Sequence, residues 1–206
     1  MKKTLFLFLM ALLPLLLPAQ NITEAQARKR IAAMASGLNT MQCDFVQTKT
    51  ISMLKSKVVS RGKMYYSRPT RLRWSYTSPY SYTLVLSGSS VTMKGAGGKT
   101  VADASKNKLF KEITRIMMSS MVGTCVSDNR SFKVSLSGSG TSWRAFLIPR
   151  RSAMRGMFSS ITVFFDLRRS VVSGVRMIEK NGDRTDIVLK NQKTNVPLNA
   201  RIFTVK

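Results

Sequence analysis

The residues that could carry out chemistry are few, and their spacing forms no familiar catalytic motif. The chain has no histidine, so it lacks the side chain that most often acts as a general acid or base near neutral pH. The acidic residues are scattered, apart from Asp183 and Asp186 beside a predicted turn. There is no Gly-x-Ser-x-Gly elbow and no phosphate-binding loop. A serine–lysine pair stays open because both residues are abundant, but the sequence favours a protein that is not an enzyme and needs no cofactor.

The two cysteines, Cys43 and Cys125, allow two interpretations. In an oxidising compartment they could form a disulfide, and otherwise they would be two buried free thiols. Two cysteines without a histidine cannot make a standard structural zinc site, so we expect no metal site.

Apolar side chains are the more prominent feature of the chain. It has 13 methionines, and Met117, Met118 and Met121 fall close together in a segment with helical spacing. Methionine is flexible and polarisable, so such a set suits a surface that must accept varied apolar shapes. Ordinary filling of a core explains the same residues, and both interpretations stay open.

The N-terminus has the order of a secretory signal peptide. Lys2 and Lys3 precede an almost wholly apolar run from Leu5 to Leu17, and small or polar residues follow. We expect residues 1–20 to be removed and residues 21–206 to form a single domain in the periplasm. No cysteine stands at the new N-terminus to carry a lipid, since the first is Cys43.

The mature chain would be strongly basic. Removing Lys2 and Lys3 leaves 32 of the 34 basic residues against 9 acidic ones, so the formal charge is about +23. Such a charge draws the protein toward anionic partners such as anionic lipid or acidic protein surfaces, or it merely keeps the protein soluble. Export makes nucleic acid an improbable partner.

Two segments have helical spacing and the rest has strand spacing. Residues 21–39 form the first helix, with Thr23 as the N-cap of a capping box, and residues 104–121 form the second, which ends at Gly123. Residues 71–76 alternate most clearly, with Leu72, Trp74 and Tyr76 on one face. The predicted strands are 43–53, 58–66, 71–76, 82–86, 91–94, 132–136, 143–148, 161–165, 171–179, 184–189 and 201–205.

The connections between these strands are short. Gly62 is a candidate bulge, Gly95 to Gly98 reads as a flexible loop, Pro149 to Gly156 as a basic loop, and Asn181-Gly182 as a tight hairpin turn. Short turns join antiparallel neighbours, so about ten to eleven strands form an antiparallel sheet. Its apolar face must be buried, either by closing the sheet on itself or by laying helices over it.

A longer pattern runs through residues 45 to 88. Phe45-Val46-Gln47 is followed by Gly62, then by Arg68-Pro69, the Arg73-Trp74 strand, Pro79 and Leu86-Ser87-Gly88. The C-terminal third adds Phe146 to Pro149, Ile161 to Asp166, the Asn181-Gly182 turn, Asn195 and Phe203. In order and spacing this resembles the bacterial outer-membrane lipoprotein carrier (LolA-like) family. Residues 95–125 match that family's pattern poorly.

The resemblance implies a fold and a function. The fold is mainly β: an unclosed antiparallel β-barrel of about ten to eleven strands, covered by two or three helices, with an apolar interior for acyl chains. The function is that of a periplasmic chaperone, which takes acylated lipoprotein from an inner-membrane ABC-type exporter and delivers it to an acceptor at the outer membrane. We expect a monomer, because a carrier passes its cargo between partners.

Site residues follow from strand parity and from the resemblance. The arginine that the family places at the Arg-Pro turn corresponds to Arg68, where it would hold the helical lid by hydrogen bonding and affect release. The residues expected to line the cavity are Phe45, Leu72, Trp74, Leu86, Ile113, Met117, Val163 and Phe165. A one-residue error in register would move any strand residue to the opposite face.

An alternative needs no cavity. A basic envelope protein could bind anionic lipid headgroups or polyanions by its surface. Salt separates the two hypotheses, because surface binding weakens as ionic strength rises and cavity binding hardly responds.

Overall fold

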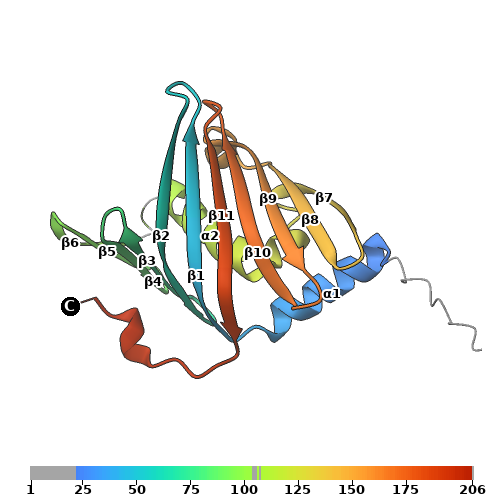
Figure 1. Ribbon diagram of the computed structural model, residues 1–206, viewed down its shortest axis with the longest axis horizontal. Coiled ribbons are helices and arrows are strands. Elements are labelled where there is room, and N and C mark those ends of the chain that lie inside the picture. Colours follow the sequence, from blue (N-terminus) through green and yellow to red (C-terminus); the bar gives the residue numbers. More distant parts are fainter. Residues whose placement is uncertain (1–21, 104–105, 107, 206) are drawn as a thin grey trace, which may run out of the picture.

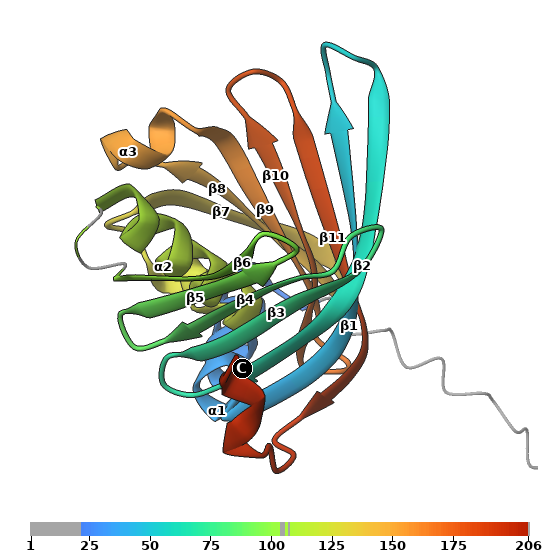
Figure 2. The ribbon, with the colours of Figure 1, turned by 90° about the vertical axis from the view of Figure 1, so that its left-hand side faces the viewer.

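Eleven strands form one curved antiparallel sheet, with helices on its concave side (Figures 1 and 2). The computed structural model describes residues 22–103, 106 and 108–205, with only the backbone described over residues 108–113. The predicted signal peptide therefore lies outside the described residues. The strands are β1 (Thr40–Ile51), β2 (Ser56–Ser67), β3 (Arg71–Ser78), β4 (Tyr82–Ser87), β5 (Ser90–Gly95), β6 (Gly98–Asp103), β7 (Phe132–Ser139), β8 (Ser142–Pro149), β9 (Phe158–Asp166), β10 (Val171–Glu179) and β11 (Arg184–Thr194).

The strand order leaves the barrel unclosed. It runs β6-β5-β4-β3-β2-β1-β11-β10-β9-β8-β7, so the first and last strands of the chain pair in the middle and β6 and β7 are the two edges. The chain passes from one edge to the other through α2 (Lys108–Val122). This arrangement confirms the predicted fold class.

Helices of the described residues cover the concave side. In Figure 2, α1 (Glu24–Gly37) and α2 lie within the curve of the sheet, and the short α3 (Ser152–Arg155) lies near the end of β8. The capping box at α1 is present, since the Thr23 hydroxyl accepts a hydrogen bond from the Gln26 backbone and the Gln26 side chain accepts one from the Thr23 backbone. Ala27, Ile31 and Ala35 form its buried face. None of the helices in the described part of the chain is long and apolar enough to cross a membrane.

Burial on the sheet follows the alternation of the sequence. Leu72 and Trp74 are buried on the concave side, and the aromatic rings of Phe45, Trp74, Tyr76 and Tyr82 form a chain of contacts across β1, β3 and β4. The rings of Phe45 and Trp74 stack with centroids 4.1 Å apart. The predicted apolar face is therefore the face that holds the core.

Three local predictions were wrong. Residues 95–98 are a tight turn into β6, a strand that the sequence did not predict. The basic loop at residues 149–156 contains α3. The predicted last strand, residues 201–205, is instead the 3-10 helix η3 (Ala200–Phe203) followed by an extended end.

The reason for this last difference lies on β3. Phe203 is buried, and the Arg71 guanidinium lies over its ring at 5.2 Å. Arg73 Nη1 donates hydrogen bonds to the carbonyl oxygens of Ile202 and Thr204. The C-terminal segment thus packs across the outer face of β3 through side chains, and it has no place in the strand ladder.

A glycine is required at position 62 because the backbones of β2 and β3 approach each other closely there. The β2–β3 register shifts between Arg61 and Gly62, which confirms the predicted bulge. A Cβ at Gly62 would lie 2.0 Å from the Ser75 carbonyl oxygen and 2.6 Å from Cζ of Phe45. The missing side chain lets the Phe45 ring lie flat over β2.

We therefore expect Gly62→Ala to lower the free energy of unfolding by about 3 kcal/mol, the upper end of overpacking costs. Urea unfolding followed by circular dichroism would measure it. The control is Gly97→Ala, where an added Cβ meets nothing within 4 Å. Equal stabilities for the two variants would contradict this account of the bulge.

Candidate functional site

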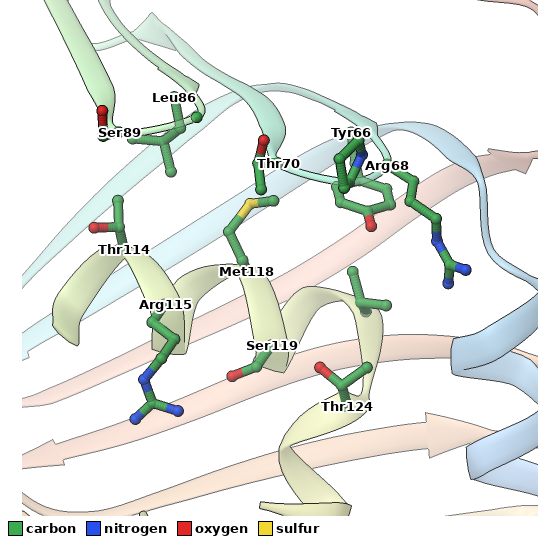
Figure 3. A pocket seen from close by; sticks show the side chains of 13 residues that line it. Tyr66, Arg68, Thr70, Leu86, Ser89, Thr114, Arg115, Met118, Ser119 and Thr124 are labelled. Atoms are coloured by element: carbon green, nitrogen blue, oxygen red, sulfur yellow. The ribbon is translucent and has the colours of Figure 1, made fainter. Parts of the chain in front are cut away.

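A pocket lies between α2 and two turns of the sheet. Its volume is about 690 Å³, within the range of about 300–1,000 Å³ typical of ligand sites. One wall is the β2–β3 turn, another is the β4–β5 turn, and α2 with the start of η2 (Thr124–Ser127) faces both (Figure 3). The lining residues are Tyr66, Arg68, Pro69, Thr70, Leu86, Gly88, Ser89, Thr114, Arg115, Met118, Ser119, Val122 and Thr124.

The apolar part of this lining comes from helix and sheet together. Met118 extends from α2 toward the turn that carries Thr70, and Leu86 lies on the opposite wall (Figure 3). Val122 continues the helical side one turn after Met118 and is buried. These groups form an apolar surface with few fixed hydrogen-bonding partners, which suits a flexible hydrocarbon better than a polar ligand.

Arg68 connects the pocket to α1. Its Nη2 donates a 2.7 Å hydrogen bond to the carbonyl oxygen of Ala35, in the last turn of α1, and its backbone N–H donates one of 2.8 Å to Asn39. The last carbonyls of a helix have no partner within the helix, so an arginine is a favourable donor there. The side chain that lines the pocket thus also fastens the end of a helix.

An ion pair holds the middle of α2. Arg115 bonds to the Asp128 carboxylate, and Asp128 also accepts from the Ser131 backbone N–H. These hydrogen bonds and the guanidinium lower the pKa of Asp128 against the opposing effect of burial. The carboxylate therefore stays charged, and it fixes α2 against the loop before β7.

The predicted site residues divide between the pocket and the core. Leu86 and Arg68 line the pocket. Phe45, Leu72, Trp74, Val163 and Phe165 are buried in the core on the concave side, and Met117 is half-buried against it. Ile113 belongs to α2, but its side chain lies outside the described residues.

Sequence reasoning missed the turn residues of the pocket. Tyr66, Thr70 and Ser89 were not selected. Tyr66 and Thr70 lie two residues before and two residues after Arg68, and Ser89 lies three residues after Leu86. Met118 was singled out only as one of a group of methionines. The signal that could have found them is the pair of turns beside Arg68 and Leu86, because connections near the open end of a sheet are where pockets form.

The thiols are placed for packing and not for reactivity. Cys43 on β1 and Cys125 in η2 are both free and buried. Burial raises the pKa of each thiol to about 12, and the Asp44 carboxylate adds to the shift at Cys43. At pH 8 both therefore stay protonated, and a protonated thiol is a poor nucleophile.

We expect the folded protein to resist alkylation by iodoacetamide at pH 8, and urea alone, without a reductant, to expose two reactive thiols. Mass spectrometry of the alkylated protein would count them. A chain that becomes reactive in urea only after reduction would contain the Cys43–Cys125 disulfide instead.

Metal ligands do not gather in the described part of the chain, where no group of three or more His, Cys, Asp or Glu side chains could hold an ion. What the arrangement offers is an apolar pocket next to a basic turn.

Comparison with known proteins gives a consistent result. The family described as "Outer membrane lipoprotein carrier protein LolA" matches residues 36–206. An outer-membrane lipoprotein carrier protein of Methylococcus capsulatus is 23% identical over 180 residues, covering 87% of this chain and 83% of that protein. The corresponding protein of Legionella pneumophila is 25% identical, covering 95% and 93%.

Solved structures agree on the fold. A conserved protein of Thermus thermophilus superimposes with a TM-score of 0.53 at 10% identity, covering 88% of this chain and 93% of that one. A chain of the MucA/MucB complex of Pseudomonas aeruginosa gives a TM-score of 0.52 at 12% identity, covering 86% and 59%. At these identities the likeness concerns the fold alone.

Proposed function

Because the chain belongs to the outer membrane lipoprotein carrier protein LolA family, we propose that it is a periplasmic carrier that shields the acyl chains of lipoproteins, or of related envelope lipids, and delivers them to the outer membrane. The observation that carries this proposal is the apolar pocket between α2 and the sheet, lined by Met118, Val122 and Leu86. In this proposal the protein binds its ligand and catalyses no reaction.

The physical task is to keep hydrocarbon out of water. Each exposed CH₂ group favours leaving water by about 0.8 kcal/mol, so an acylated protein cannot cross an aqueous compartment alone. A pocket that offers flexible apolar walls offsets this cost without demanding one ligand shape. Opening α1 and α2 away from the sheet would expose more of the apolar concave side, where Phe45, Trp74 and Phe165 lie.

The location and partners follow from the same role. The N-terminal pattern of residues 1–20 supports export, and cargo would pass from an inner-membrane ABC-type exporter to an acceptor at the outer membrane. A single copy of the chain suffices for such a transfer.

A direct test compares two ligands that differ only in their acyl chains. Purified mature protein is mixed with a triacylated lipopeptide or with the same peptide without acyl groups, and complexes are separated by size-exclusion chromatography. We expect only the acylated peptide to co-elute with the protein. Co-elution of both peptides to the same extent would contradict the proposal.

Arg68 has a definite role within this proposal. Its hydrogen bond to Ala35 stabilises the empty form, in which α1 is closed over the sheet. Cargo that opens this helix must break the bond, so the bond lowers the affinity for cargo and favours release. A charged hydrogen bond at an exposed side chain contributes about 1 kcal/mol, equivalent to roughly fivefold in affinity.

We therefore expect Arg68→Leu to bind a fluorescent acyl probe roughly fivefold more tightly and to release it more slowly. Stopped-flow displacement by unlabelled lipid would measure the release. The matched control is Arg71→Leu, which removes the same charge near the same turn but leaves the bond to α1 intact. Weaker binding by Arg68→Leu would show that the side chain supports the ligand and not the closed helix.

A further inference from the structure

The turn between β1 and β2 presents large apolar side chains to solvent. Met53 is 91% exposed and Leu54 is 67% exposed, and Val58 and Val59 are exposed on the start of β2. We call residues 52–59 the hairpin tip. In Figure 1 it projects beyond the other connections at its end of the sheet. Exposed apolar side chains gathered in this way usually mark a contact surface.

Positive charge surrounds the hairpin tip. Lys55 and Lys57 are exposed within it, and Lys180 is exposed in the neighbouring β10–β11 turn. No acidic residue occurs between Lys49 and Arg61. The two acids of the neighbouring turn, Glu179 and Asp183, both pair with Lys49, at 3.0 and 3.5 Å.

The same ion-pair cluster fixes the position of the hairpin tip. The Ser52 backbone N–H donates a 2.9 Å hydrogen bond to Oδ1 of Asp183, and the Lys55 N–H donates one to the Ser52 carbonyl. The hydrogen bond from Ser52 and the nearby Lys49 ammonium hold the pKa of the Asp183 carboxyl below its usual value, so the carboxylate stays charged near neutral pH. The apolar side chains thus lie on a turn whose backbone is fixed by hydrogen bonds, between the two paired strands β1 and β2.

We propose that the hairpin tip docks the protein on an anionic lipid bilayer, with Met53 and Leu54 entering the acyl region and Lys55, Lys57 and Lys180 contacting the headgroups. A bilayer fits this chemistry because its apolar interior lies directly beneath a negatively charged surface. A protein partner fits less well, since a stable protein interface buries about 800 Å² on each side and needs more than a few apolar residues. The large positive charge of the chain draws the tip toward such a surface.

The hairpin tip and the pocket are separate sites. They lie at opposite ends of β2, which runs from Ser56 in the tip to Ser67 beside the pocket. At about 3.3 Å per residue, the strand separates them by roughly 35 Å. Docking therefore does not rest on the carrier function, and a change at the tip should leave the pocket unaltered.

A tryptophan placed in the tip reports directly on insertion. The native Trp74 and Trp143 are buried, so their emission should change little when the protein meets a membrane. We expect Leu54→Trp emission to shift to shorter wavelength with phosphatidylglycerol vesicles and to be quenched by brominated acyl chains. The control is Val101→Trp, at an exposed position on the edge strand β6, where we expect no quenching.

Two double variants test the apolar part and the basic part of the hairpin tip separately. We expect Met53→Ser with Leu54→Ser to bind phosphatidylglycerol vesicles at least tenfold more weakly in co-sedimentation, while fluorescent acyl probe binding in solution stays unchanged. We expect Lys55→Ser with Lys57→Ser to lose binding to anionic vesicles at moderate salt. Absence of quenching at position 54, or equal quenching at positions 54 and 101, would overturn the proposal, and the tip would then be assigned to a protein partner. If the unmodified protein failed to bind the acyl probe in solution but Leu54→Trp was still quenched by brominated lipid, the carrier function would be contradicted and this proposal would stand.

Discussion

Replacing Trp74 by alanine is expected to lower the free energy of unfolding by about 3–5 kcal/mol, the usual range for removing a large aromatic side chain from a core. Trp74 is only 2% exposed, and its ring stacks on Phe45 at 4.1 Å. The Phe45 ring in turn packs against Gly62, where a Cβ would lie 2.6 Å from Cζ of Phe45, so the stacked pair belongs to a tightly packed part of the core. Urea unfolding at pH 7 would measure the change.

The control for this experiment is Trp74→Phe. It keeps an aromatic ring beside Phe45 and leaves a smaller cavity, so it should cost clearly less than the alanine variant. A loss below about 1 kcal/mol for Trp74→Ala would mean that the ring lines open space, as the sequence predicted, and does not belong to the core.

The second large effect is expected at Met118. An aspartate there places a carboxylate on the apolar wall of the pocket, where a bound hydrocarbon would bury the charge without a partner. We expect Met118→Asp to weaken binding of a fluorescent acyl probe roughly a hundredfold, which corresponds to about 2.8 kcal/mol. Because Met118 is half-buried on the surface of α2, the fold should tolerate the change.

The matched control is Met53→Asp. It makes the same substitution at a side chain in the hairpin tip, at the other end of β2 from the pocket. Its probe binding should equal that of the unmodified protein. If Met118→Asp binds the probe as well as Met53→Asp does, acyl chains bind somewhere other than this pocket.

Most of the fold could be predicted from local patterns. The alternation at Leu72, Trp74 and Tyr76 gave the correct face of β3, because strand parity is a local property. The capping residue Thr23 and the stop at Gly123 were correct for the same reason, and Gly123 has the positive φ of +91° that favours glycine. The end of the chain was wrong because Phe203 packs against Arg71, a residue more than a hundred positions away.

The pocket was harder to predict than the fold. Parity tells which side of the sheet a residue faces, but it does not tell whether a neighbour fills the space in front of it. Trp74 and Leu86 share a face, yet Trp74 is stacked against Phe45 whereas Leu86 borders the pocket. The difference depends on where α2 crosses the sheet, and residues 95–125 are the part of the chain in which the family resemblance is weakest.

The central claim is that apolar ligands bind inside the protein and not on its basic surface. Titration of the purified mature protein with an environment-sensitive fluorescent acyl probe, at low and at high salt, tests it most directly. We predict saturable binding whose affinity hardly changes with salt, and displacement of the probe by a natural lipoprotein. Binding that disappears at high salt, or no binding at all, would contradict the claim and favour a basic protein that uses this fold without a ligand cavity.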